Sequence, residues 1–233
     1  TILEGYGLTE TSPVITVNRM EDLRPGTVGK VIPGVEVKIA SDGEILTRGP
    51  HVMQGYFKKP EATREAIDPE GWFHTGDIGV VDGEGFLTIT DRKKDLIVTS
   101  GGKNIAPQPI ENLLKTHPLI GEIVMIGNNR HFPSALVVPN FENLERWARE
   151  RGLSAGGRAE LVARTEVQEL YDQTVKELTA HMAQFEKIKK VALLTTEFTQ
   201  ESGELTPTLK VKRRVVEQKY KDVIDRLYEG AAA

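Results

Sequence analysis

The sequence predicts an α+β fold in two parts, an antiparallel β-subdomain followed by a compact domain of mixed helices and strands. From about residue 34 to 90, apolar and polar residues alternate in short segments, which is typical of strands. Residues 96–230 instead carry apolar residues at helical spacing, separated by short apolar runs. The charge run Asp91-Arg92-Lys93-Lys94-Asp95 lies between the two parts, and we interpret it as the joint.

The first part contains a predicted hairpin, a further strand and one short helix. Residues 35–39 alternate apolar with polar side chains, Asp42-Gly43 is a turn dipeptide, and residues 44–47 continue as the partner strand. Residues 86–90 are a second strand candidate, and residues 60–66 begin with Pro followed by Glu, as helix N-termini do. Gly, Pro and Thr cluster in residues 1–33, which predicts loops rather than a packed element.

The second part is predicted to contain helices and strands in alternation. Asn140 is a suitable N-cap for the helix that follows it. The helices are predicted near residues 110–117, 141–148, 159–184 and 216–227, and the strands at residues 122–127, 135–138 and 190–196.

The composition argues against several classes of protein. A net charge of −4 offers no basic excess, so we expect no nucleic-acid partner. The absence of Cys excludes disulfides and thiolate sites, and the five His are scattered without metal-ligand spacing. No apolar run approaches the roughly 20 residues that span a bilayer, and no signal segment opens the chain. We therefore expect a soluble cytoplasmic protein, with peripheral membrane contact left open.

Two motifs in the first part carry residue types that suit a nucleotide. In Tyr6-Gly7-Leu8-Thr9-Glu10-Thr11, a glycine permits close backbone approach, a hydroxyl suits a phosphate oxygen, and a carboxylate suits Mg²⁺. In Trp72-Phe73-His74-Thr75-Gly76-Asp77, a carboxylate after a Thr-Gly turn suits the two hydroxyls of a ribose. Either motif alone is explained more simply by an ordinary turn.

Two further motifs accompany the joint and the C-terminal region. The charge run is followed by Ser100-Gly101-Gly102-Lys103-Asn104-Ile105, which alone indicates a solvated face and a glycine turn. Residues 205–213 place Lys210 on a short loop before the last helix. Alone, Lys210 is one basic residue in a basic patch.

Taken together, in this order and spacing, the motifs resemble the acyl-adenylate-forming superfamily, which includes acyl-CoA synthetases, luciferases and the adenylation domains of peptide synthetases. The resemblance covers essentially the whole chain. Residues 6–11 match YGxTE, 43–56 match GE(I/L)…RGP…GY, 71–77 match GW(F/L)xTGD, 91–105 match DRxKD…GGxNI, and 207–213 match the terminal segment with its lysine. The resemblance implies that residues 1–90 end the large AMP-binding N-terminal domain, 91–95 are a hinge, and 96–233 form a small mobile C-terminal domain.

Within the superfamily, the chain is most similar to long-chain fatty-acid–CoA ligases. Residues 71–111, including Pro107-Gln108-Pro109, and the long helical segment at 140–185 carry this likeness. It implies that a fatty acid is activated with ATP and Mg²⁺ to an acyl-adenylate and then transferred to CoA. Two alternatives remain: a fatty-acyl-AMP ligase that loads a carrier protein, and a non-catalytic module that retains the fold.

The resemblance also assigns roles to residues of the first motif. Tyr6 is expected to lie along the adenine, with Gly7 in the same nucleotide-binding turn. Thr9 is expected to contact the nucleotide phosphates and Glu10 to bind Mg²⁺.

The remaining motifs supply further expected site residues. Asp77 and Arg92 are expected to hold the ribose hydroxyls, and Lys94 to occupy the hinge position. Gly102 is expected to line the passage for the pantetheine arm of CoA. Lys210 is expected to be the catalytic lysine of adenylate formation.

One element of the family pattern is missing from these 233 residues. No Ser/Thr/Gly-rich phosphate loop ending in Lys precedes Tyr6, and the chain starts at Thr1 rather than Met. We therefore expect a fragment that lacks half of the active site and is inactive alone. Because most of the first domain would be absent, we expect residues 1–33 to be poorly ordered or rearranged.

Overall fold

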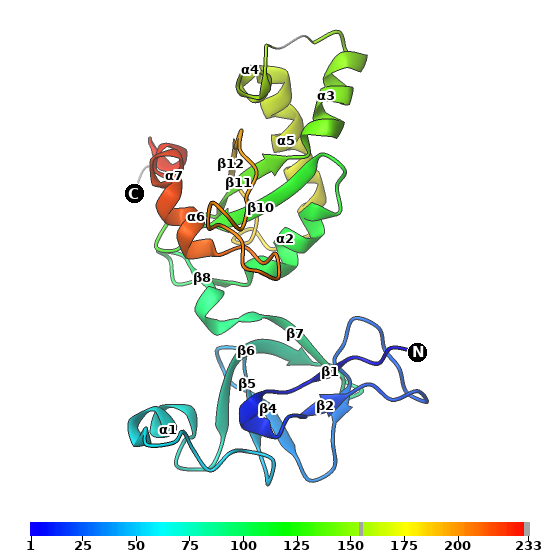
Figure 1. Ribbon diagram of the computed structural model, residues 1–233, viewed down its shortest axis with the longest axis vertical. Coiled ribbons are helices and arrows are strands. Elements are labelled where there is room, and N and C mark those ends of the chain that lie inside the picture. Colours follow the sequence, from blue (N-terminus) through cyan, green and yellow to red (C-terminus); the bar gives the residue numbers. More distant parts are fainter. Residues whose placement is uncertain (154–155, 231–233) are drawn as a thin grey trace. The chain divides into compact units, whose positions relative to one another are not determined.

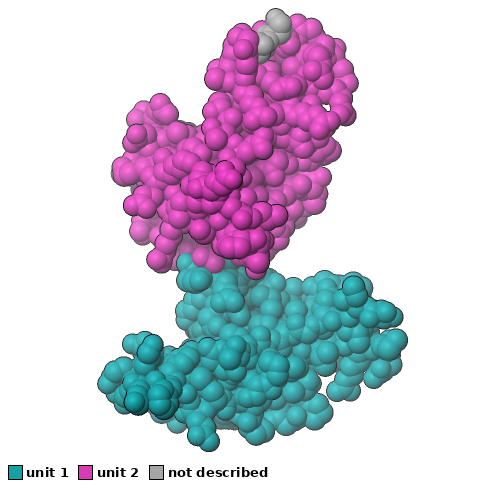
Figure 2. All heavy atoms as spheres, viewed as in Figure 1, with its two compact units in different colours: residues 1–94 teal, residues 95–233 magenta. Residues whose placement is uncertain are grey.

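The computed structural model describes residues 1–153 and 156–230 of the chain. It confirms the α+β class, because antiparallel sheets and helices are both present. The chain divides into two compact units, Thr1–Lys94 (unit 1) and Asp95–Ala233 (unit 2), which are coloured separately in Figure 2. Residues 154–155 and 231–233, which fall within the predicted second domain, lie outside the described residues.

Unit 1 is built on a four-stranded antiparallel sheet of order β4-β5-β6-β7. The predicted hairpin at its start is confirmed, and Gly43 closes the turn with a φ of 87°, a conformation that a residue without Cβ adopts readily. The predicted short helix is also confirmed as α1. The elements are β4 (Glu36–Ile39), β5 (Glu44–Arg48), α1 (Pro60–Ala66), β6 (Phe73–Val81) and β7 (Leu87–Arg92), and η2 (Lys93–Asp95) follows β7 (Figure 1).

Residues 1–33 are mostly loop, as expected, but they also contain a small packed sheet, so the expectation of no packed element was wrong. β1 (Gly5–Tyr6), η1 (Thr9–Thr11), β2 (Thr16–Val17) and β3 (Lys30–Val31) are present, and the strands form an antiparallel sheet of order β1-β2-β3. Ile15 is fully buried, and Gly29 lies so close to Val17 that an added Cβ would be 2.0 Å from its carbonyl carbon. The backbone of residues 28–29 also hydrogen-bonds Leu87 at the start of β7. These partners are distant in sequence, which is why local composition did not indicate them.

The Thr-Gly turn expected before Asp77 is not a turn, because residues 73–81 form one strand. Gly76 has a φ of 71° inside β6, and the register with β7 shifts between Ile78 and Gly79. This irregularity bends the strand without ending it. Asp77 therefore lies in the middle of a sheet instead of at a strand end.

Unit 2 has a three-stranded sheet of order β10-β11-β12, in which β10 and β11 pair antiparallel and β11 and β12 pair parallel. The predicted strands are confirmed, and residues such as Leu136 and Val137 in the central strand are fully buried. Helices pack on this sheet, as Figure 1 shows for α2 and α5. The elements are β8 (Ile97–Val98), β9 (Asn104–Ile105), α2 (Pro107–Lys115), β10 (Ile120–Ile126), β11 (Ser134–Pro139), α3 (Phe141–Glu150), α4 (Arg158–Ala163), α5 (Thr165–Leu178), β12 (Lys190–Leu193), α6 (Arg213–Lys219) and α7 (Lys221–Tyr228).

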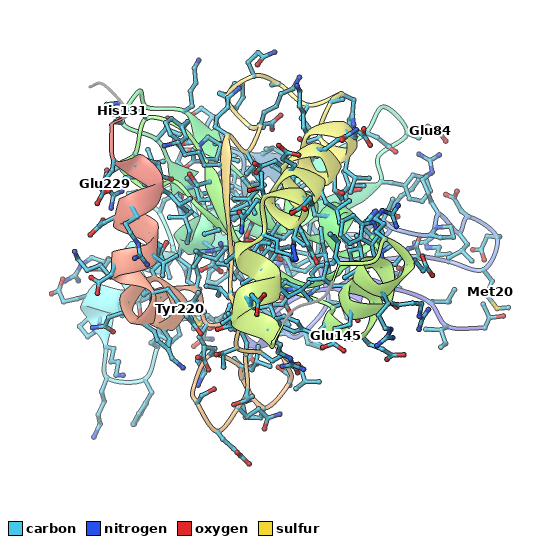
Figure 3. All side chains as sticks on the ribbon, turned by 90° about the horizontal axis from the view of Figure 1, so that it is seen from above. Met20, Glu84, His131, Glu145, Tyr220 and Glu229 are labelled. Carbon is cyan, nitrogen blue, oxygen red and sulfur yellow. The ribbon has the colours of Figure 1, made fainter. Side chains whose placement is uncertain are left out.

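Two predicted helices are each divided into two. The helix expected at residues 159–184 breaks at Arg164, whose extended ψ of 137° separates α4 from α5. The final helix breaks at Tyr220, which Figure 3 labels at the junction of α6 and α7. Apolar periodicity continues across both breaks, so it does not reveal them. The cap expected at Asn140 is confirmed, because its side chain accepts from the Asn143 amide.

Among the described residues, none of the helices is both long enough and apolar enough to cross a membrane.

Candidate active site

Asp77 and Arg92 are direct cross-strand partners in the β6–β7 pair. The Arg92 Nε donates to Asp77 Oδ1 at 2.7 Å. Asp77 is only 4% exposed, whereas the Arg92 side chain is 53% exposed. A buried carboxylate is thus bonded to a guanidinium that also reaches solvent, an arrangement that holds the carboxylate at a fixed position.

Tyr6 holds the second oxygen of the same carboxylate. Its hydroxyl donates to Asp77 Oδ2 at 2.7 Å, and its ring packs in the unit 1 core with Ile15 and Leu87. Burial raises the pKa of Tyr6, and its hydrogen bond to the Asp77 anion adds to the rise. A carboxylate has about four acceptor positions, and Tyr6 and Arg92 fill one on each oxygen of Asp77. The ring of Tyr6 is largely covered by protein, with the residue 9% exposed.

The backbone around Asp77 is fixed by side chains of the neighbouring strand positions. The Asp77 amide donates to Thr75 Oγ1 at 3.1 Å, and the Thr75 hydroxyl donates to the Ile45 carbonyl at 2.7 Å. The Gly76 amide donates to Glu44 Oε1 at 3.0 Å. These bonds stabilise the bend in β6 that presents Asp77.

Glu44 is a buried carboxylate in the GE(I/L) motif, and the sequence alone did not identify it as a site residue. Its Oε2 lies 3.0 Å from His74 Nδ1 and 2.8 Å from Lys93 Nζ, and Lys93 also contacts Asp42 at 2.7 Å. Burial alone would raise the pKa of Glu44, but hydrogen bonds from Lys93, His74 and the Gly76 amide outweigh it and lower the pKa. Glu44 therefore links the strand that carries Asp77 to the segment that follows Arg92. Only the tertiary pairing reveals this, because its partners lie 30 to 49 residues away.

The first motif places Glu10 in the 3-10 helix η1, where its carboxylate accepts from the Tyr56 hydroxyl at 2.9 Å. No cluster of three or more His, Asp or Glu suited to a metal occurs in the described part of the chain. Mg²⁺ is commonly held by one or two carboxylates together with substrate phosphates, so a single partly exposed Glu10 fits only that shared mode. Thr9 is exposed on the same short helix.

Close packing against the backbone explains why position 7 is a glycine. A Cβ at this position would lie 1.7 Å from the Pro13 carbonyl oxygen, so no other residue fits without moving the backbone. The close approach that the sequence suggested for Gly7 is therefore made to protein in this structure.

Gly102 lies in the turn between β8 and β9. Its φ is 73°, its amide donates to the Thr99 carbonyl, and a Cβ at this position would meet nothing within 4 Å. Ser100 Oγ in the same turn lies 3.0 Å from His131 Nδ1. The turn thus presents an unobstructed backbone surface with polar neighbours.

Lys210 lies near the end of a short hairpin that precedes α6. The Thr206 amide donates to the Lys210 carbonyl at 2.8 Å, and the Lys210 amide donates to Thr206 Oγ1 at 3.0 Å. Leu209 has a φ of 59°, and Leu205 bridges Val211 at the base. The exposed Lys210 side chain borders a groove of about 310 Å³ in unit 2.

The structure brings Tyr6, Asp77 and Arg92 together within unit 1. Gly102 and Lys210 belong to unit 2, and Lys94 is the last residue of unit 1. Each unit thus carries its own set of candidate residues.

Comparison with known proteins matches the chain to two family models. The family model described as the AMP-binding enzyme C-terminal domain matches residues 94–232, and the model described as AMP-binding enzyme matches residues 1–57. The chain is 44% identical over 229 residues to the long-chain-fatty-acid–CoA ligase FadD15 of Mycobacterium tuberculosis, covering 98% of this chain and 38% of that protein. It is 37% identical over 250 residues to the long-chain-fatty-acid–CoA ligase ACSBG1 of Homo sapiens, covering 97% of this chain and 34% of that protein.

A solved structure has the same fold. The A domain of carboxylic acid reductase from Segniliparus rugosus, in complex with AMP and a co-purified carboxylic acid, matches with a TM-score of 0.74 and 22% identity. The match covers 99% of this chain and 35% of that one. The chain therefore spans less than half the length of the proteins that it matches.

Proposed function

The chain belongs to the AMP-binding enzyme family, and on that premise we propose that it forms part of an ATP-dependent ligase that joins a long-chain fatty acid to CoA. The observation that carries the proposal is the Asp77 carboxylate, which is buried, held at both oxygens and still able to accept hydrogen bonds. This geometry suits the two hydroxyls of a ribose. The names of FadD15 and ACSBG1 support the fatty acid and CoA as substrates.

In the proposed first half-reaction, the fatty-acid carboxylate attacks the α-phosphorus of ATP and pyrophosphate leaves. Asp77 and Arg92 hold the ribose, Tyr6 supports Asp77, and Thr9 contacts the phosphates. Lys210 approaches the reacting phosphate and offsets the charge that develops on its oxygens. Mg²⁺, held by Glu10 together with the phosphates, would supply further charge neutralisation.

In the proposed second half-reaction, the CoA thiol attacks the acyl carbonyl of the adenylate and AMP leaves. Gly102 provides the open surface along which the pantetheine arm passes. Lys210 and Gly102 belong to one unit, so rotation at Lys94 would exchange them between the two steps. We accordingly propose residues 1–90 as the end of the AMP-binding domain, 91–95 as the hinge and 96–233 as the mobile domain.

The experiment uses the longer protein that contains this chain and measures the two half-reactions separately. Lys210→Ala should slow acyl-adenylate formation by orders of magnitude, since a group of this kind contributes about 3–4 kcal/mol to the transition state. Thioester formation from supplied acyl-adenylate should continue. Lys176→Ala on the exposed face of α5 is the matched control and should change neither rate.

The wild-type protein then decides the reaction class. Palmitate, acetate and benzoate are offered as acids, and CoA and an acyl carrier protein as acceptors. Adenylate formation that prefers palmitate, with transfer to CoA, supports the proposal. Transfer to the carrier protein alone, or absence of adenylate formation with every acid, would contradict it.

A further inference from the structure

At one point on the edge of the unit 2 sheet, side chains satisfy the backbone polar groups. β10 is an edge strand, and edge strands present N–H and C=O groups that no strand pairs. At Met125 the amide donates to Glu111 Oε1 at 2.7 Å, and the carbonyl accepts from Arg213 Nη1 at 2.6 Å. α2 supplies Glu111 and α6 supplies Arg213, so both helices are attached to the same point of the edge.

Glu111 and Arg213 also bind each other through two parallel hydrogen bonds. Arg213 Nη1 lies 2.8 Å from Oε1 and Nη2 lies 3.0 Å from Oε2. Their side chains are only 12% and 16% exposed. Bidentate, charge-assisted bonds in a buried setting define direction as well as distance. The pair therefore fixes the start of α6 relative to the sheet.

The hairpin that carries Lys210 is closed by the bridge between Leu205 and Val211, two residues before Arg213. Within the hairpin, Thr206 and Lys210 hydrogen-bond each other. From outside it, Gln200 Nε2 donates to the Pro207 carbonyl, and the Leu205 amide donates to the Thr199 carbonyl. The direction of the hairpin depends on the groups that hold its two strands at the base. At the base, the Lys212 amide donates to the Glu204 carbonyl at 2.7 Å, and Arg213 follows Lys212 directly in the chain. Glu111, Lys210 and Arg213 line the same groove.

We propose that Glu111 and Arg213 are positioning residues that orient Lys210 for acyl-adenylate formation. The inference rests on the proposed ligase function and adds to it two residues that act through Lys210 without touching substrate. Displacement of a catalytic group by about 1 Å costs up to roughly 100-fold in rate, so loss of the pair should reduce the first half-reaction strongly.

A purely structural role would have a different consequence. Gly102, which serves the proposed second half-reaction, belongs to the same unit but to the separate β8–β9 pair. General destabilisation of unit 2 would therefore lower both half-reactions. A positioning role lowers only the first.

The test uses the longer protein that contains this chain, with the variants Arg213→Met, Arg213→Lys and Glu111→Gln. Rates are measured for pyrophosphate release from palmitate and Mg·ATP, and for thioester formation from supplied palmitoyl-adenylate and CoA. Arg213→Met should slow pyrophosphate release by roughly 10- to 100-fold and leave thioester formation within about twofold. Arg213→Lys retains the positive charge but cannot form both parallel hydrogen bonds, so its rate of pyrophosphate release should lie between those of wild type and Arg213→Met.

Arg146→Met removes a guanidinium from an exposed ion pair on α3 and serves as the matched control, with both rates unchanged. Thermal unfolding is recorded for every variant. Equal loss of both half-reactions in Arg213→Lys and Glu111→Gln, or no loss in either, would overturn the inference. A wild-type protein that forms no adenylate would overturn the proposed function and the inference with it. A wild-type protein that forms adenylate, with variants that lose both half-reactions equally, would overturn the inference alone.

Discussion

The Nε of Arg92 lies 2.7 Å from Oδ1 of Asp77, across two strands that place these residues directly opposite each other. The cation is half exposed and the anion is almost completely buried. The sheet thus holds the Asp77 carboxylate at a fixed position beside an exposed guanidinium. Because the proposed ribose contact depends on this carboxylate, it is the first target for mutation.

Asp77→Asn should weaken nucleotide binding in the longer protein. The amide cannot accept at both positions, and Arg92 loses its anionic partner. We expect KM for ATP to rise roughly 10- to 100-fold, in line with about 1.5–3 kcal/mol for hydrogen bonds to a charged group. Asp82→Asn, at an exposed turn of the same unit, is the control. An unchanged KM for ATP in Asp77→Asn would remove Asp77 from the ribose site.

Tyr6→Phe should lower the free energy of unfolding of unit 1 by about 1 kcal/mol, because the buried Asp77 loses a donor while the ring remains. The chain contains two Trp, and Trp72 belongs to unit 1. In a Trp147→Phe background, urea unfolding followed by fluorescence reports on Trp72. Tyr56→Phe, whose partner Glu10 is partly exposed, should cost less than about 0.5 kcal/mol. Equal losses in the two variants would contradict the role given to Tyr6.

Lys94→Pro should slow the second half-reaction and spare the first, whereas Lys210→Ala should slow the first and spare the second. Proline fixes φ and removes a backbone donor at the proposed pivot. The variant should still form acyl-adenylate but transfer it slowly to CoA. Glu61→Pro, in the first turn of α1 where proline is tolerated, is the control. A normal overall rate in Lys94→Pro would place the pivot elsewhere.

Because of Glu204, we expect the free energy of unfolding of unit 2 to fall in acid. Burial would raise the pKa of Glu204, but hydrogen bonds from Lys219 and Ser202 outweigh it and lower the pKa to about 2. Because the folded pKa lies below the unfolded value of about 4.5, the stabilisation is present above pH 4.5 and is lost as the pH falls toward 2.

The measurement is the free energy of unfolding against pH for wild type and Glu204→Gln. The difference between them should be largest near neutral pH and should shrink between about pH 4.5 and 2. Glu201→Gln, on the same loop but exposed, should follow the wild-type profile. A constant difference across this range would show that the ion pair with Lys219 contributes nothing.

The 233-residue chain alone should bind Mg·ATP very weakly. Asp77 and Arg92 are present, but no Ser/Thr/Gly-rich phosphate loop ending in Lys is found in the sequence. Binding energy comes from groups held together in one geometry, so we expect a Kd no tighter than roughly millimolar. Isothermal titration of the chain, with the longer protein as control, measures this. Micromolar binding, or thioester formation from palmitate and CoA by the chain alone, would contradict the account of the site.

Local sequence pattern was sufficient to predict an element wherever residues close together in the chain determine it. The sequence by itself determined the α+β class, the hairpin closed at Gly43, helix α1 with its N-terminal Pro60, and the cap at Asn140. It also determined the family, because the motifs stand in the right order and spacing. These features are short in range, and a turn dipeptide or an N-cap acts within a few residues.

The tertiary structure decided everything that depends on partners far apart in the chain. Residues 1–33 contain a small sheet because three short strands pair there and Ile15 is buried. Asp77 becomes a mid-strand residue because β7 pairs with its strand. Arg213 meets Glu111 across 102 residues, a contact that no local period encodes. The physical reason is the same in each case. Periodicity reports which face of an element is apolar, whereas the partner that covers a buried polar group is chosen only when the chain folds.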